Sequence, residues 1–259
     1  MNKDNIEDIR TQFTRQANAY AASAQASDEA AHTKLVEICQ PAPEACVLDV
    51  ACGPGFLTIA FARRCAAAVG LDATDAMLSM ARAEAGKRGV GNVRFEKGVA
   101  TALPFAPASF DIVVCRAAFH HFPEPGRVLV EMCRVVKPGG KILTADIVTS
   151  EDPIDADAHN EIERLCDPTH VRALKATEFH ELFRANRLDI VNELPGRIHY
   201  DLDGWILHGG PAPEIEAEIR RRFEEALKQD RTGLHVRSRE GKILFTHQTL
   251  VLVAVSRDE

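Results

Sequence analysis

The sequence predicts an α/β protein built around a doubly wound, mostly parallel sheet of seven strands. Two features carry this prediction. Short apolar runs alternate with helical patterns from residue 46 to residue 148, and the chain closes with a long β-forming segment. Strands separated by helices of about 10–15 residues are typical of βαβ units, which build parallel sheets. The closing segment is expected to form the last strand, antiparallel to its neighbours.

The strands are expected where apolar and β-branched residues follow one another over short segments. These segments are CVLDVA (46–51), AAAVGLDA (66–73), VRFEKGV (93–99), FDIVVCRAAF (110–119), GKILTADIV (140–148), LDIVNELPGRIHY (188–200) and ILFTHQTLVLVAVS (243–256). Helices are expected where apolar residues recur at helical spacing. They lie within residues 6–38, 55–65, 75–89, 126–136, 152–170, 177–187 and 211–229. This alternation predicts a ligand site at the carboxyl ends of the first, second and fourth strands.

All 259 residues are interpreted as one domain. Its parts are an N-terminal helical cap (1–40), a core (41–200), a helical insertion that would act as a lid (201–243) and the last strand (244–257). The insertion separates the two terminal strands, which could pair with each other.

The composition disfavours several classes of function. The formal net charge is −7 and the sequence shows no basic face, so nucleic acid is not an expected partner. The seven cysteines include no C-x-x-C pair, and several lie in apolar runs, which predicts buried free thiols and no metal site. The first residues contain no apolar signal region, and no apolar run approaches the roughly 18 residues of a membrane span. We therefore expect a cytoplasmic protein without integral membrane contact.

The loop after the first strand discriminates between two classes of ligand. In VLDVACGPGFLT (47–58), Thr58 stands where a dinucleotide-binding loop has its third glycine, and Pro54 has no N–H to donate to a phosphate. Asp49 adds a negative charge that would repel a pyrophosphate and attract an ammonium or sulfonium group. These features disfavour a nicotinamide-dependent oxidoreductase, which shares the alternating architecture. They favour a cationic ligand without phosphates.

An acidic residue at the end of the second strand indicates that this ligand contains a nucleoside. Asp72 follows Gly55 by 17 residues, where a carboxylate can accept hydrogen bonds from both hydroxyls of a ribose. A purely structural interpretation, an aspartate that starts a turn or caps a helix, applies better to Asp75. Asp72 is therefore the predicted ribose-binding residue.

Four motifs in this order resemble class I S-adenosylmethionine-dependent methyltransferases, in particular the group that includes the ubiquinone/menaquinone-biosynthesis C-methyltransferases. They are VLDVACGPGFLT, VGLDATDAMLSMA, VRFEKGVATALPFAPASFDIVVCRAAFHHFPEP and EMCRVVKPGGKILTADI, within a resembling region from about residue 10 to residue 195. The resemblance implies a Rossmann-like fold, S-adenosylmethionine as cofactor, S-adenosylhomocysteine as product, and direct displacement of a methyl group onto a small-molecule acceptor. A nucleic-acid substrate is disfavoured because no N/D-P-P-Y/F motif follows the fourth strand.

The resemblance also assigns most of a cofactor site. For the methionine part of the cofactor it implies Asp49, Ala51, Gly53 and Gly55, with Arg116 nearby. For the adenine it implies Ala73 and, close to it, Met77. Met77 fits an ordinary core position equally well.

Two positions depart from the family pattern. Ala51 stands where a glycine is usual and adds one methyl group. Val99 stands where the group commonly has an aspartate that accepts a hydrogen bond from the adenine amino group, so the backbone around Ala100 and Thr101 is left to bind the adenine. Losing one such hydrogen bond would cost about 1.5–3 kcal/mol of affinity. The alternative function is therefore a catalytically inactive protein that binds S-adenosylmethionine or S-adenosylhomocysteine.

Histidines after the fourth strand are candidates for contact with the methyl acceptor. His120 and His121 are adjacent in CRAAFHHFPEP (115–125), so they are expected to point in different directions, with at most one facing the substrate. His121 is the candidate general base. The alternative is a histidine that packs under the following loop.

Two further segments are candidates for the acceptor side of the site. CDPTHVRAL (166–174) resembles a D-P-S-H-V-R element of this group and contributes Asp167, His170 and Arg172. Its structural alternative is a turn at Asp167 that pairs with Arg172. Phe13 and Tyr20 resemble an N-terminal aromatic segment that covers the cofactor, and they fit helix-core positions equally well. The acidic composition and the helical lid favour a small, aromatic or hydrophobic acceptor.

Overall fold

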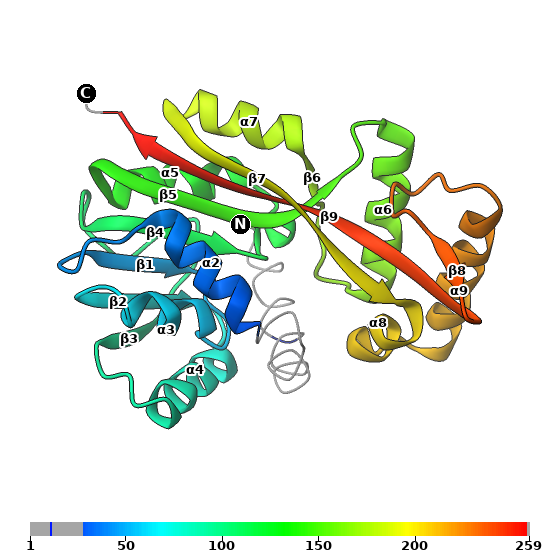
Figure 1. The fold of residues 1–259 in the computed structure, drawn as a ribbon, viewed down its shortest axis with the longest axis horizontal. Helices are drawn as coiled ribbons and strands as arrows, with labels where there is room; N and C mark the ends of the chain where they lie inside the picture. The colour runs from blue at the N-terminus through cyan, green and yellow to red at the C-terminus, as the bar shows by residue number, and fades with distance from the viewer. Residues whose placement is uncertain (1–10, 12–27, 258–259) are drawn as a thin grey trace.

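The computed structural model describes residue 11 and residues 28–257. Its centre is a nine-stranded sheet in which seven strands follow the order β3-β2-β1-β4-β5-β9-β7 (Figure 1). These are β1 (Cys46–Val50), β2 (Ala67–Asp72), β3 (Val93–Lys97), β4 (Phe110–Arg116), β5 (Val136–Thr149), β7 (Leu188–Asp201) and β9 (Lys242–Ser256). The first five pair in parallel, whereas β9 is antiparallel to both β5 and β7. The predicted mostly parallel sheet with an antiparallel last strand is confirmed.

Two short strands extend the sheet beyond the seven that the sequence predicts. β6 (Leu174–Lys175) pairs with β5, and β8 (Arg237–Arg239) pairs with β9. Strands of two and three residues are too short to show the alternation of apolar and polar residues by which a strand is predicted. Tertiary pairing alone defines them.

Helices cover both faces of the parallel strands, as a doubly wound sheet requires. They are α2 (Glu29–Cys39), α3 (Phe56–Ala62), α4 (Asp75–Lys87), α5 (Pro125–Val135) and α7 (Ala176–Ala185). Successive residues of a strand point to opposite faces. In β4, Val114 packs in one apolar cluster with α2 and α3, whereas Val113 packs in another with α5 and α7. None of the described helices is long and apolar enough to cross a membrane.

A separate apolar core lies at the far ends of β7 and β9. β7 and β9 continue past the parallel strands, and α6 (Pro153–Cys166), α8 (Leu202–Gly209) and α9 (Pro213–Lys228) gather around their far halves (Figure 1). The Trp205 ring lies 5.3 Å from that of Phe245, which lies 4.9 Å from that of Phe223. All three side chains are buried. Trp205 therefore stabilises the insertion by packing.

The chain order places a ligand site between β1 and β4. From β1 the chain continues outward to β2 and β3, and it then returns to β4 on the other side of β1. In doubly wound sheets ligands bind at such a reversal, outside the carboxyl ends of the strands. The loops that begin at Ala51, Ala73 and Ala117 follow β1, β2 and β4 at this edge.

Candidate functional site

A pocket lies among these loops at the carboxyl edge of the sheet. Seven of the residues predicted for the cofactor site line it, together with His121. The seven are Ala51, Gly53, Asp72, Ala73, Met77, Val99 and Ala100. Leu71 and Phe122 add to its apolar wall. A largely apolar slot with one carboxylate suits the flat base and the sugar of a nucleoside.

Two backbone hydrogen bonds fix the carboxylate of Asp72 in this pocket. The N–H of Gly53 donates to Oδ2 at 3.0 Å, and the N–H of Thr74 donates to Oδ1 at 2.8 Å. Burial raises the pKa of Asp72 above its ordinary value, although these two donors act in the opposite direction. Each carboxylate oxygen can accept a further hydrogen bond. The side chain is therefore prepared to accept from two neighbouring hydroxyls.

A smaller, polar pocket continues on the other side of the same loop. Asp49, His32 and Arg116 line it, and it shares Ala51 and Gly53 with the first pocket. This arrangement brings two of the residues predicted for the methionine part, Asp49 and Arg116, into one place. A carboxylate and a guanidinium together match the ammonium and carboxylate of an amino acid.

Asp49 is held by a residue that sequence reasoning used only to exclude a dinucleotide. The hydroxyl of Thr58 donates to Oδ2 of Asp49 at 2.6 Å, and both side chains are buried. Burial raises the pKa of Asp49 to about 7, and Thr58 and Arg116 offset only part of this effect. The sequence contained a sign of this contact, because a threonine with a hydrogen-bonding side chain stands where a dinucleotide-binding loop has its third glycine. Its role as a hydrogen-bond donor to Asp49 was missed.

The conformation of the loop explains its glycines and makes Ala51 an exception. Ala51 and Gly55 have φ of 58° and 77°, in the left-handed region that L-residues with a side chain disfavour. The backbone at Ala51 is therefore strained. From the sequence, only the added methyl group was expected to matter at this position. Gly55 does not line either pocket. It is the N-cap residue of α3, and its Cα lies close to the side chains of Phe95 and Ala81.

Replacing Gly55 with alanine is expected to destabilise the fold by about 2–5 kcal/mol, because a positive φ costs about 1–2 kcal/mol and overpacking about 1–3 kcal/mol. The new Cβ would lie 2.8 Å from Cε1 of Phe95 and 2.9 Å from Cβ of Ala81. Urea denaturation measures the effect. Gly89→Ala is the matched control, because Gly89 has a φ of 65° and no neighbour within 4 Å of the new Cβ. Equal losses for both variants would contradict the packing explanation.

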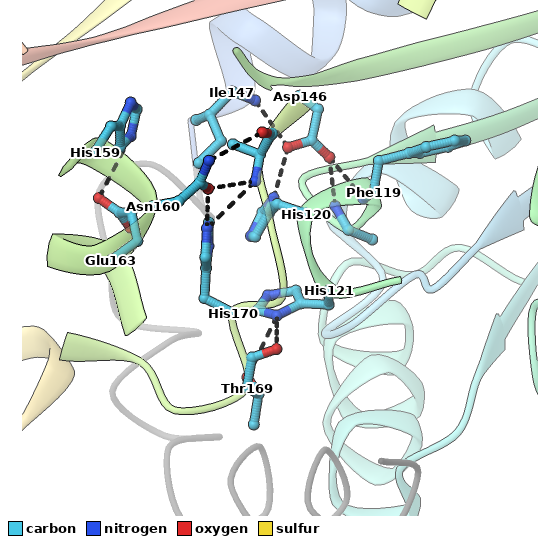
Figure 2. A network of polar contacts seen from close by, with 12 residues as sticks. Phe119, His120, His121, Asp146, Ile147, His159, Asn160, Glu163, Thr169 and His170 are labelled. Carbon is cyan, nitrogen blue, oxygen red and sulfur yellow. Dashed lines mark hydrogen bonds and ion pairs between the residues drawn. The ribbon is translucent and has the colours of Figure 1, made fainter. Parts of the chain in front are cut away.

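The two adjacent histidines point in different directions. They lie on η1 (Phe119–His121), a short 3-10 helix after β4, and of the two only His121 lines the first pocket. Nδ1 of His121 lies 3.1 Å from the carbonyl oxygen of Thr169, so this nitrogen carries the proton and donates it (Figure 2). Burial and the neighbouring His120 lower the pKa of His121 to about 4. His121 is therefore neutral at physiological pH.

His120 is instead bound to Asp146, which sequence analysis missed. Burial acts to lower the pKa of His120, but the Asp146 carboxylate, 2.6 Å from Nδ1, raises it overall. Asp146 also accepts from the N–H groups of Ala118 and Phe119, so it holds η1 at the end of β5 (Figure 2). The available signal was a lone acidic residue inside the apolar strand ILTADIV. Nδ1 of His120 is therefore occupied by Asp146.

The predicted acceptor-side loop is mostly occupied with its own contacts. Asp167 accepts from the N–H and hydroxyl of Thr169 at 2.9 and 2.7 Å. Nε2 of His170 donates to Oδ1 of Asn160 at 2.8 Å, inside the fold (Figure 2).

The structural alternative for this loop holds in part. A turn at Asp167 is present, but Arg172 is exposed and pairs with Glu178 at 2.8 Å, so the expected pairing of Arg172 with Asp167 is wrong. Arg172 pairs with Glu178 because Glu178 lies at the start of α7, where it also accepts from the N–H of Lys175. Thr169 is the residue of this loop that contacts His121. The predicted residues Phe13 and Tyr20 lie outside the described residues.

Comparisons with known proteins agree with this geometry. Residues 42–189 match the family model described as methyltransferase domain. The chain is 36% identical over 185 residues to the uncharacterized methyltransferase YcgJ of Bacillus subtilis (strain 168), covering 71% of this chain and 73% of that protein. It is 34% identical over 113 residues to the ubiquinone/menaquinone biosynthesis C-methyltransferase UbiE of Marinomonas sp. (strain MWYL1), covering 42% and 45%.

Solved structures show the same architecture. The crystal structure of the YcgJ protein from Bacillus subtilis superposes with a TM-score of 0.81 at 31% identity, over 89% of this chain and 100% of that one. A putative methyltransferase, BH2331, from Bacillus halodurans C-125 superposes with a TM-score of 0.84 at 26% identity, over 88% and 100%.

Proposed function

From the premise that this chain belongs to the methyltransferase domain family, as a class I S-adenosylmethionine-dependent enzyme, we propose that it methylates a small organic molecule. The observation that carries the proposal is the pair of pockets around the loop 51–54. One pocket has the chemistry to bind a nucleoside and the other has the chemistry to bind an amino acid. S-adenosylmethionine joins these two parts and supplies an electrophilic methyl group.

The residues of the two pockets have separate tasks in this proposal. Asp72 accepts from the ribose hydroxyls, and the apolar wall with Ala73 and Met77 holds the adenine. Val99 lines the wall without a polar group, so hydrogen bonds to the adenine come from the backbone near Ala100. Asp49 attracts the positive charges of the methionine part. This division leaves the side of the pocket at His121 for the methyl acceptor.

Displacement at a sulfonium needs alignment more than acid–base chemistry. With the proton on Nδ1, the His121 ring presents Nε2 as an acceptor nitrogen, which would orient a hydroxyl or amine of the acceptor. A pKa of about 4 makes this imidazole a weak base. His121 therefore contributes mainly by orienting the nucleophile, and it would receive a proton only as the nucleophile reacts.

His121→Gln is expected to lower kcat by about 10–100-fold, at or below the lower limit of acid–base contributions because the base is weak. The affinity for S-adenosylmethionine should not change. Protonation of His121 should not lower the wild-type kcat until the pH approaches 4, because the imidazole is mostly neutral above that value. Formation of S-adenosylhomocysteine at several pH values measures both effects. A variant with unchanged kcat would remove His121 from the mechanism.

The acceptor is proposed to be small and aromatic or hydrophobic. The apolar residues beside His121, including Phe122 and Ala118, support this choice. A relative named for ubiquinone/menaquinone biosynthesis supports a small-molecule acceptor as well. The seven free cysteines, five of them buried, support a reducing compartment, so we propose the cytoplasm as the place of action.

Calorimetric titration with S-adenosylmethionine, and separately with NADH, tests the proposal. We expect micromolar binding of the methyl donor and none of NADH. Incubation with methyl-labelled donor and a panel of phenols and quinols then tests for transfer of the label. Failure to bind the donor would overturn the proposal. Binding without formation of S-adenosylhomocysteine on any acceptor would favour the alternative of an inactive binding protein.

A further inference from the structure

Three side chains of types that commonly bind metals meet outside the two pockets around the loop 51–54. His159 and Glu163 lie one turn apart on α6, and His247 lies on β9. One ligand atom of each residue lies within 4.8 Å of the ligand atoms of the other two. The three residues are only 2%, 7% and 3% exposed. Figure 2 shows His159 and Glu163 side by side on α6, next to the network that contains Asn160 and His170.

The three ligand atoms lack hydrogen bonds of their own. Nε2 of His247 lies 2.8 Å from Oε1 of Glu163, and Nε2 of His159 lies 3.8 Å from it, yet none of these atoms has a partner in hydrogen-bond geometry. Buried polar atoms are almost always satisfied. An ion pair of Glu163 with His247 alone would leave His159 without a partner. A cation between them would satisfy all three.

We propose that His159, Glu163 and His247 bind a divalent transition-metal ion that joins α6 to β9. Two imidazole nitrogens and one carboxylate oxygen form a ligand set that suits Zn²⁺ and related ions, whereas Mg²⁺ and Ca²⁺ prefer oxygen ligands. Zinc bonds of about 2.0–2.1 Å place tetrahedral ligand atoms about 3.4 Å apart. The observed contacts of 2.8 and 3.8 Å lie on either side of this value.

The surroundings favour a structural role for this metal. The His247 ring lies 5.2 Å from that of Phe245, and Ile162 and Cys166 of α6 pack in the same apolar core. An apolar shell of this kind keeps water away from the site and so strengthens the attraction between a metal ion and the Glu163 carboxylate. None of the three ligands lines the cofactor pocket. The metal would hold α6 in place, and with it the loop 167–173 that positions His121.

This proposal differs from the prediction that the protein has no metal site, which was based on the cysteines alone. The histidine ligands were overlooked because His247 lies far from α6 in sequence. The spacing His159-x-x-x-Glu163 alone is common on helices. Only the packing of β9 against α6 assembles the third ligand.

Zinc uptake by the purified full chain after treatment with a chelator tests the proposal. We expect one Zn²⁺ per chain and a rise in Tm of about 5–10 °C when free zinc exceeds Kd by about a hundredfold. Mg²⁺ should leave Tm unchanged. Glu163→Gln and His247→Gln should each weaken zinc binding by about 100-fold or more. His180→Gln, on α7 and outside the site, should bind zinc as the wild type does.

X-ray absorption spectroscopy of the zinc-loaded wild type identifies the ligand atoms directly, so it tests the proposal even if the variants fold poorly. It should show imidazole and oxygen ligands without sulfur. Sulfur ligands, no zinc uptake by the wild type, an equal shift of Tm with Mg²⁺, or unchanged affinity in folded Glu163→Gln and His247→Gln would each overturn the proposal. Titration with S-adenosylmethionine on the same samples reports on the methyltransferase proposal separately, because the zinc ligands do not line its pocket.

Discussion

Asp72→Ala is expected to weaken the binding of S-adenosylmethionine by about 100-fold or more. If Asp72 binds the ribose as proposed, the variant loses two hydrogen bonds from the ribose hydroxyls to a charged acceptor, each worth about 1.5–3 kcal/mol. It also removes the acceptor for the N–H groups of Gly53 and Thr74, which shape the pocket. Titration calorimetry at constant salt and pH measures the change in Kd.

Asp75→Ala is the matched control for this experiment. Asp75 lies three residues further along, at the start of α4, and its exposed side chain pairs with Lys97. The control removes the same charge without touching the pocket, so the affinity should stay near that of the wild type. Thermal unfolding of both variants checks that they fold. Nearly unchanged binding by a folded Asp72→Ala would contradict the assignment of Asp72 to the ribose.

Asp49→Asn is expected to raise the free energy of unfolding of the ligand-free protein by about 2–4 kcal/mol at pH 7 and above. The folded-state pKa of Asp49 is about 7, above its ordinary value of 3.8. Between these values the folded state binds more protons than the unfolded chain, so wild-type stability falls as the pH rises through this window. Asparagine carries no charge to desolvate and can still accept from Thr58. Urea denaturation at pH 5 and pH 8 should therefore show a gain that grows with pH.

The same variant should bind S-adenosylmethionine more weakly despite its greater stability. A positively charged ligand favours ionised Asp49, so wild-type affinity should fall up to about tenfold for each pH unit below 7. The affinity of Asp49→Asn should lack this component. Because the same ligand is used for both proteins, its own titration cancels in the comparison. Parallel pH profiles for the two proteins would show that Asp49 does not bind the charged part of the cofactor.

Much of the fold and the position of the candidate site could be predicted from local sequence patterns. Alternating apolar runs and helical patterns define βαβ units, and their connection allows few arrangements of a parallel sheet. The candidate site was therefore expected at the carboxyl edge, where Asp49 is the next-to-last residue of β1 and Asp72 is the last residue of β2. The two-residue β6 and three-residue β8 were not predictable, because their pairing depends on neighbours far away in the chain.

The sequence by itself determined the order of the strands and helices, the edge of the sheet that carries the pocket, and the class of ligand disfavoured by Thr58 and Pro54. These properties depend on residues close together in the chain. The tertiary structure alone decided that His121 faces the pocket while His120 binds Asp146, and that His247 meets His159 and Glu163. Such contacts join separate elements, and the direction and burial of each side chain are set by the packing of those elements against one another.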